Sequence, residues 1–251
     1  MQVTFLGTGS AMPTGGRMQS GLLLSSADRS LLVDCGSGVL HRLANTDVGY
    51  EAVSSLLLTH HHLDHVADLL PLIKARWLAG EEHLEIVGPL GTKGLVDDLL
   101  SVYEYLDGRI ELRIREVTAD QSFDVAGFHT ESHETRHSMD GLAYRFTESS
   151  AELPTFAFSG DTEAFAGLAR FASPCRVLAH DCSFPNSVDV SGHPTPTRLG
   201  EALADCEVDR LYLTHLYPHT EGNLDEMREA VSGGGFDGEV RIARDGLRLD
   251  L

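Results

Sequence analysis

The chain has 251 residues, a formal net charge of -19 and only two lysines, Lys74 and Lys93. No apolar run reaches the roughly 18 to 20 residues that span a bilayer, and no signal segment opens the chain, so we expect a cytoplasmic protein without membrane contacts. A surface this acidic repels polyanions, although the composition resembles that of proteins from a high-salt cytoplasm, where screening weakens the argument.

Apolar runs typical of strands recur at short intervals. They cover Val3–Leu6, Leu22–Leu24, Leu31–Asp34, Leu56–Thr59, Leu84–Val87, Ile110–Val117, Leu142–Phe146, Phe156–Phe158, Val177–Ala179 and Leu211–Thr214. Apolar residues at helical spacing predict helices at Val66–Leu78, Thr92–Tyr105, Glu163–Phe171, Thr195–Cys206 and Leu224–Val231. This mixture predicts sheets packed face to face with helices outside, and the absence of a long linker predicts a single domain over residues 1–251.

The most informative segment is His60-His61-His62-Leu63-Asp64-His65, which follows an apolar run and reads H-x-H-x-D-H. A divalent metal ion needs several nitrogen or oxygen donors directed at one point, and a compact run supplies many of them from one loop. Imidazole and carboxylate donors suit zinc, and they also accept manganese, iron or nickel.

Other histidines and aspartates directly follow predicted strands. These residues are Asp161, His180, Asp181 and His215. Strand ends in a layered fold collect at one rim, where loops are free to vary and ligands bind. The sequence therefore predicts that these side chains join the H-x-H-x-D-H run at one site.

The combined pattern resembles the metallo-β-lactamase superfamily, and its ribonuclease Z-like branch in particular. The segments that carry the resemblance span nearly the whole chain: Phe5–Ser10, Pro13, Arg17, Leu31–Gly36, His60–His65, Gly88-Pro89, His137-Ser138, Gly141, Ser159–Thr162, His180-Asp181, His193–Thr195 and Leu213–His215. The resemblance implies a four-layered αββα sandwich with two divalent metal ions at the rim between two mixed sheets. The first ion would be bound by His60, His62 and His137, the second by Asp64, His65 and His215, and both by Asp161.

The resemblance also implies catalytic groups outside the set of metal ligands. His193 would meet the phosphate and either stabilise charge in the transition state or protonate the leaving oxygen, and Asp181 would orient it and raise its pKa. Asp64 is expected to contribute to catalysis as well as to metal binding. Two departures from the branch bear on the geometry: Pro194 stands where a small hydroxyl residue is usual, and Asp181 replaces the more usual glutamate.

Some of these residues have alternatives that the sequence leaves open. His133 competes with His137 as the third histidine of the first ion. The structural alternative for Asp161 is the N-cap of a helix over Thr162–Phe171. The structural alternative for His193 is a loop residue before a helix. The histidines expected outside the metal ligands are His61, His180 and His219.

We predict a binuclear metal-dependent hydrolase, namely a phosphodiesterase that uses a metal-bridging hydroxide on a small phosphodiester or a nucleotide 3′ end. Ribonuclease Z carries a tRNA-gripping arm between the third metal histidine and the bridging aspartate. Here His137 and Asp161 lie only 24 positions apart (161 − 137), which disfavours nucleic acid as a partner. The alternatives are tRNA 3′ processing, ester or lactone hydrolysis, and a non-catalytic protein that binds metal or a partner. The branch commonly forms homodimers, so we expect one here.

Overall fold

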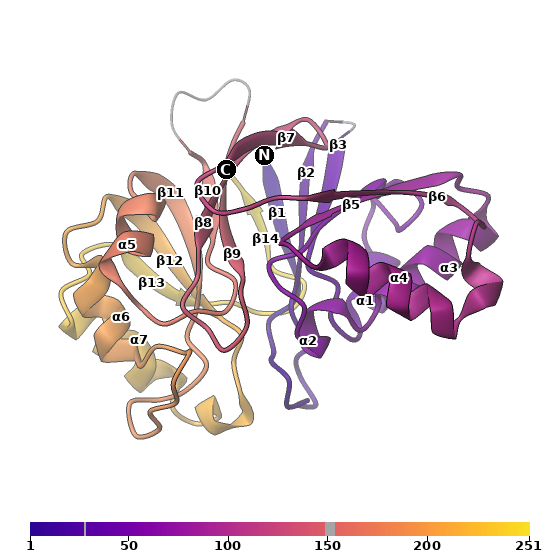
Figure 1. The fold of residues 1–251 in the computed structure, drawn as a ribbon. Helices are drawn as coiled ribbons and strands as arrows, with labels where there is room; N and C mark the ends of the chain where they lie inside the picture. Colours follow the sequence, from indigo (N-terminus) through magenta and orange to yellow (C-terminus); the bar gives the residue numbers. More distant parts are fainter. Residues whose placement is uncertain (28, 149–153) are drawn as a thin grey trace.

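The fold consists of two seven-stranded sheets that face each other. The computed structural model describes residues 1–27, 29–148 and 154–251 (Figure 1). The strand order in the first sheet is β14 (Arg248–Asp250), β1 (Gln2–Gly7), β2 (Gly21–Ser26), β3 (Arg29–Val33), β4 (Ser55–Leu57), β5 (His83–Gly88) and β6 (Glu111–Glu116). The order in the second sheet is β13 (Glu239–Ile242), β12 (Val208–Thr214), β11 (Cys175–Asp181), β10 (Phe156–Phe158), β9 (Leu142–Thr147), β8 (Phe128–Glu134) and β7 (Ser122–Val125).

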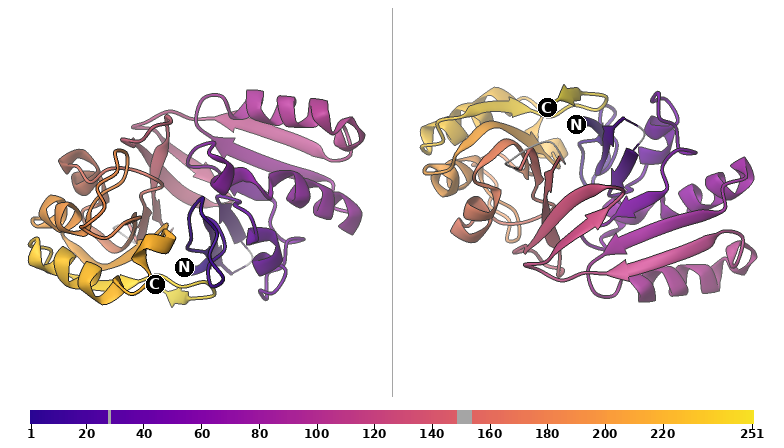
Figure 2. Two further views of the ribbon diagram at one scale, coloured as in Figure 1. Left: turned by 90° about the horizontal axis from the view of Figure 1, so that it is seen from below. Right: turned by 90° about the horizontal axis from the view of Figure 1, so that it is seen from above.

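The helices cover the outer faces of the two sheets. The first sheet carries α1 (Val39–Leu43), α2 (Leu63–Val66), α3 (Leu69–Ala79) and α4 (Thr92–Val102), and the second carries α5 (Ala166–Ala172), α6 (Pro196–Leu203) and α7 (Leu224–Gly233). Figure 2 shows α4, coloured magenta, running along β6 on the side away from the second sheet. The four-layered αββα sandwich expected from the sequence is therefore confirmed.

Strand periodicity explains how each sheet is buried on both faces. Along β2, Leu22 and Leu24 point into the core between the sheets, and Leu23 points into the core beneath the helices. Successive side chains of a strand point to opposite faces, so an unbroken apolar run fills two cores at once. This pattern accounts for the continuous apolar strands in the sequence.

One predicted helix, Val66–Leu78, is in fact two helices. α2 ends at Val66 and α3 begins at Leu69. Between them, the Asp68 carboxylate accepts a hydrogen bond from the Leu40 backbone N–H at 2.9 Å. This contact ties the break to α1, a tertiary interaction that helical periodicity does not reveal.

Other differences follow from polarity and length. The helix predicted at Thr92–Tyr105 ends at Val102 and continues as the 3-10 turn η1 (Glu104–Leu106), and the one predicted at Glu163–Phe171 begins only at Ala166. The elements β7, β8, β13, β14 and α1 were not predicted. β8, for example, reads FHTESHE, and its polar residues hide a strand whose alternate positions are buried.

The carboxyl ends of four strands lie at one rim of the sandwich. Within each sheet three antiparallel pairs are followed by three parallel pairs, so β3 to β6 run parallel in one sheet and β10 to β13 in the other. The carboxyl ends of β4, β10, β11 and β12 consequently open toward the same rim. In Figure 1 this is the end that carries α2, opposite the adjacent chain termini. None of the helices described is long and apolar enough to cross a membrane.

Candidate metal centre

The structure brings all seven predicted metal ligands together at this rim. One group contains His60, His62, His137 and Asp161, and the other contains Asp64, His65, Asp161 and His215. Within each group the candidate donor atoms lie within 4.8 Å of one another. Asp161 belongs to both groups, so the two clusters adjoin.

Four loops and one short helix supply these side chains. His60 and His62 follow β4, and the chain then turns directly into α2, which carries Asp64 and His65. The remaining three donors are His137 in the connection between β8 and β9, Asp161 three residues after the end of β10, and His215 directly after β12. At the last position His215 adopts a φ of 58°, a left-handed conformation that is costly outside glycine and is often found at functional sites.

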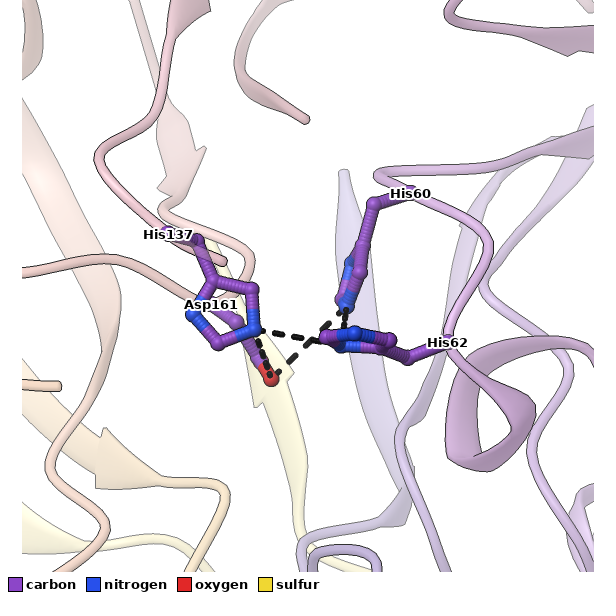
Figure 3. Close-up of side chains that lie close together, drawn as sticks. All are labelled: His60, His62, His137 and Asp161. Carbon is purple, nitrogen blue, oxygen red and sulfur yellow. Dashed lines mark hydrogen bonds and ion pairs between the residues drawn. The ribbon is translucent and has the colours of Figure 1, made fainter. Parts of the chain in front are cut away.

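The first cluster is dominated by imidazole nitrogens. His62 Nδ1 lies 3.0 Å from His60 Nε2 and 3.1 Å from His137 Nε2 (Figure 3). The Asp161 carboxylate approaches His60 Nε2 to 3.8 Å and His137 Nε2 to 3.9 Å. Burial lowers the pKa of His60 well below its usual value, which keeps the ring neutral and its lone pair available.

The second cluster adds a second carboxylate. His215 Nε2 lies 3.1 Å from Asp64 Oδ2 and 3.2 Å from Asp161 Oδ2, and His65 Nε2 lies 3.3 Å from Asp161 Oδ1. His65 Nε2 is buried and has no hydrogen-bond partner among the described residues. Buried nitrogens without a partner are rare in native proteins, and a cation between the two aspartates would satisfy this one.

The donor chemistry of both clusters fits a pair of divalent ions. Three imidazoles with one carboxylate oxygen, and two imidazoles with two carboxylates, are donor sets that zinc, manganese, iron and nickel accept. His137 rather than His133 occupies the third histidine position of the first cluster. Asp161 is not a helix N-cap, since α5 begins only at Ala166.

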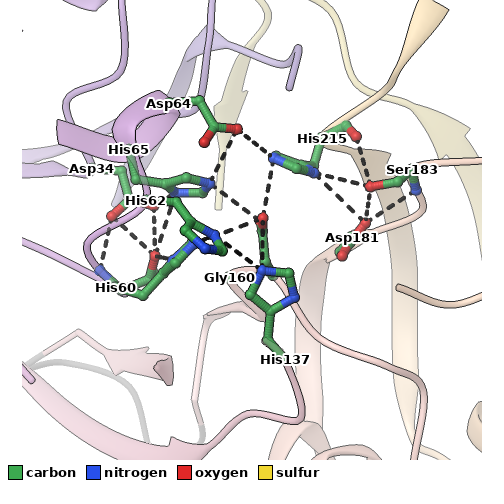
Figure 4. A network of polar contacts seen from close by, with 12 residues as sticks. Asp34, His60, His62, Asp64, His65, His137, Gly160, Asp181, Ser183 and His215 are labelled. Carbon is green, nitrogen blue, oxygen red and sulfur yellow. Dashed lines mark hydrogen bonds and ion pairs between the residues drawn. The ribbon is translucent and has the colours of Figure 1, made fainter. Parts of the chain in front are cut away.

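The buried residue Asp34 supports the second cluster, a role that sequence reasoning did not assign. Its Oδ2 accepts a hydrogen bond from His65 Nδ1 at 2.7 Å (Figure 4), and its Oδ1 accepts the Thr59 backbone N–H at 2.8 Å. A carboxylate behind a metal-ligating histidine fixes its tautomer, which leaves Nε2 free to face a cation. Its place directly after the apolar run Leu31–Val33 was the available signal.

We expect Asp34→Ala to lower the free energy of unfolding of the metal-free protein by several kcal/mol. The change strands the His65 Nδ1–H and the Thr59 N–H in the interior, and each unpaired buried group costs about 1–3 kcal/mol. Denaturant unfolding of chelator-treated protein measures the effect. Asp47→Ala is the control, because that carboxylate is 92% exposed and its loss should stay within about 0.5 kcal/mol. Equal stability of Asp34→Ala and the parent chain would contradict the role.

A third group lies beside the two clusters and contains Asp181, His193 and His215. His193 Nδ1 is 2.6 Å from Asp181 Oδ2, and both side chains are buried. Burial by itself would lower the pKa of His193, but the Asp181 carboxylate outweighs it and raises the pKa to about 9. The raised pKa favours the protonated form of the ring, with Nδ1–H donated to Asp181.

Ser183 joins this pair to the metal cluster, a connection that sequence reasoning missed. Its hydroxyl donates to Asp181 Oδ1 at 2.6 Å and lies 2.9 Å from His215 Nδ1 (Figure 4). Since the hydroxyl has only one proton, it accepts from His215 Nδ1–H. The His215 Nε2 lone pair is then directed at Asp64 and Asp161.

The remaining histidines lie outside the clusters. His61 turns away from them and meets Thr92 Oγ1 at 2.8 Å, and His180 is buried against the Asp181 carbonyl. His133 stacks on Phe171 with ring centroids 5.1 Å apart. His219 is exposed on the 3-10 turn η2 (Pro218–Thr220).

The two mixed sheets, their outer helices and the His/Asp clusters at the rim define a metal-dependent hydrolase with the metallo-β-lactamase fold. The metallo-β-lactamase fold protein YhfI from Bacillus subtilis superimposes with a TM-score of 0.84 at 28% identity, covering 99% of this chain and 98% of that one. The short form of human tRNase Z superimposes with a TM-score of 0.80 at 22% identity, covering 100% of this chain and 99% of that one. This second likeness concerns the fold alone.

The sequence comparisons identify the family. Ribonuclease Z of Mycobacterium avium (strain 104) is 30% identical over 278 residues, which cover 100% of this chain and 98% of that protein. Residues 1–230 match the family model described as Anti-Pycsar protein Apyc1. The chain belongs to the family of the Anti-Pycsar protein Apyc1. Within the metallo-β-lactamase superfamily it is a ribonuclease Z-like member. The predicted superfamily and the predicted metal-dependent hydrolase class are thus both confirmed.

Proposed function

We propose that the protein is a binuclear phosphodiesterase that cleaves a small phosphodiester or a nucleotide 3′ end. The observation that carries the proposal is the buried His193–Asp181 pair beside the seven clustered metal ligands. The His193 ring centroid lies 4.9 Å from that of His137 in the first cluster and 5.6 Å from that of His215 in the second. A protonated donor next to two cation positions suits a reaction in which a phosphoryl group gains negative charge.

The proposed roles follow from the contacts. When bound, two divalent ions would supply a nucleophilic water of lowered pKa and neutralise phosphoryl charge. His193 donates Nδ1–H to Asp181, which leaves Nε2–H for a phosphoryl oxygen or the leaving oxygen. Asp181 fixes the ring and favours its charged form, and Asp64 completes the second cluster beside the reacting phosphate.

The size and charge of the substrate are inferred from what surrounds the site. The 24 positions from His137 to Asp161 also contain β9 and β10, so this span leaves no room for a tRNA-gripping arm. The short span therefore supports a substrate that is bound without such an arm. The net charge of -19 disfavours a long polyanion at low salt. A small ester such as a cyclic nucleotide meets both conditions.

The test is a metal-resolved activity screen. Chelator-treated protein is loaded with zinc, manganese, iron or nickel and assayed with bis-p-nitrophenyl phosphate, cyclic nucleotides, phosphomonoesters, lactones and precursor tRNA. We expect metal-dependent turnover of the small phosphodiesters and none by the chelated protein. Absence of small-diester turnover, together with clean cleavage of precursor tRNA, would overturn the proposal.

The second candidate is a tRNA 3′ processing endonuclease, which the 30% identity to a ribonuclease Z over the full chain favours. Ester or lactone hydrolysis is a third, because the same clusters would serve an acyl substrate. The His193–Asp181 pair favours the two phosphodiester functions over acyl hydrolysis, because an acyl substrate needs no imidazolium that faces a phosphate. Zinc as the resident metal, a homodimer and a cytoplasmic location stay predictions.

A further inference from the structure

Three aromatic rings form a wall next to the metal clusters. Phe184 and Tyr217 are stacked with ring centroids 4.5 Å apart and an interplanar angle of 26°. The His219 ring lies 5.4 Å from that of Phe184. The rings come from two connections, one after β11 and one after β12, so the parallel pairing of these strands brings them together.

The wall differs from core packing in how its rings are exposed. Phe184 is only 6% exposed, whereas Tyr217 is half-buried and His219 is exposed. Phe184 covers one face of the Tyr217 ring. Tyr217 is therefore held in place from behind while part of its surface stays open.

The wall lies close to His215 of the second cluster and to His193, where the phosphodiester would react. The Tyr217 ring centroid lies 5.8 Å from that of His215, a member of the second cluster, and 6.0 Å from that of His193. Phe184 is likewise 5.8 Å from His193. A phosphodiester held between the clusters and His193 would place its organic substituent within reach of Tyr217.

We propose that Tyr217, backed by Phe184, is a stacking platform for the nucleobase of the substrate. The proposal rests on the proposed phosphodiesterase function and specifies its substrate class as a nucleoside phosphodiester. Stacking suits this protein because every base has a π-face, so the platform needs no basic side chain in a chain of net charge -19. It also tolerates different bases.

The experiment compares two substrates with the same reacting group. One is a nucleoside 3′,5′-cyclic phosphate, and the other is 1-deoxyribose 3,5-cyclic phosphate, which lacks the base. Stacking of one base on an aromatic ring is worth about 1–3 kcal/mol, so the metal-loaded protein should favour the nucleotide by about tenfold in kcat/KM, mainly through KM. Tyr217→Leu should reduce this preference at least about fivefold, and Tyr217→Phe should retain it.

The outcomes distinguish failure of the stacking platform from failure of the proposed phosphodiesterase function. Equal kcat/KM for the two substrates in the unmodified protein, or an undiminished preference in Tyr217→Leu, would overturn the platform and leave the phosphodiesterase standing. Turnover of bis-p-nitrophenyl phosphate but of neither cyclic phosphate would overturn the platform alone, and turnover of none of the three diesters would overturn both proposals. The substrate ratio of the unmodified protein needs no variant, and the thermal unfolding and metal content of Tyr217→Leu show whether the substitution disturbs the fold or the clusters.

Discussion

Asp161→Ala is expected to lower the metal content of the protein from two equivalents to one or none, and to reduce kcat by on the order of a thousandfold. Asp161 is the one carboxylate that belongs to both clusters. Without it, the first cluster retains only imidazole donors, and the second loses one of its two carboxylates. Metal ions provide several kcal/mol of charge stabilisation in the transition state, and about 1.4 kcal/mol corresponds to a factor of ten in rate.

Metal analysis after gel filtration and steady-state kinetics measure the two effects separately. Asp237→Ala is the matched control, because this aspartate is exposed in the connection after α7 and lies outside both clusters. Asp161→Asn keeps the shape of the side chain and removes its charge, so it should also lose metal. An Asp161→Ala protein that retains two equivalents of metal would contradict the shared-ligand assignment.

His193→Ala is expected to reduce phosphodiester turnover by about 10²–10⁴-fold while metal content stays near two equivalents. The side chain is buried beside both clusters but is not one of the seven residues that form them. Its Nδ1 is held by Asp181 at 2.6 Å, and its removal deletes the proton donor without deleting a metal donor. The expected signature is a fall in kcat for phosphodiesters.

The same variant discriminates between substrate classes. Hydrolysis of a lactone or ester by His193→Ala should change little, since the imidazolium faces a phosphoryl group in the proposed complex. His83→Ala serves as the control, because this histidine is exposed on β5. Equal losses for diester and lactone would refute a phosphate-specific role, and loss of metal in His193→Ala would reassign the residue to the clusters.

Much of the site could be predicted because its residues are local in sequence or follow apolar strands. His60, His62, Asp64 and His65 lie within six positions, and such spacing depends only on one loop and one short helix. The choice between His137 and His133 needed the structure. Both lie in a polar region, and only the pairing of β8 with β9 places His133 on the strand and His137 beyond its end.

The supporting contacts were harder to infer. Asp34 and His65 are 31 positions apart, and Ser183 and His215 are 32 apart, so no local pattern pairs them. They meet because the parallel strands β3 and β4, and likewise β11 and β12, end at the same rim. Helix ends posed the same difficulty, since the break between α2 and α3 depends on a contact from Asp68 to the backbone of α1.

The sequence by itself determined which donor atoms the protein has, because imidazole and carboxylate groups after apolar strands define the metal chemistry whatever their final distances. It also determined the layered fold, since apolar runs with strand and helix periodicity must bury their faces against one another. Only the tertiary structure decided how the donors divide into two clusters that share Asp161. It also decided that His193, Phe184 and Tyr217 lie beside them, because these proximities arise from the pairing of distant strands.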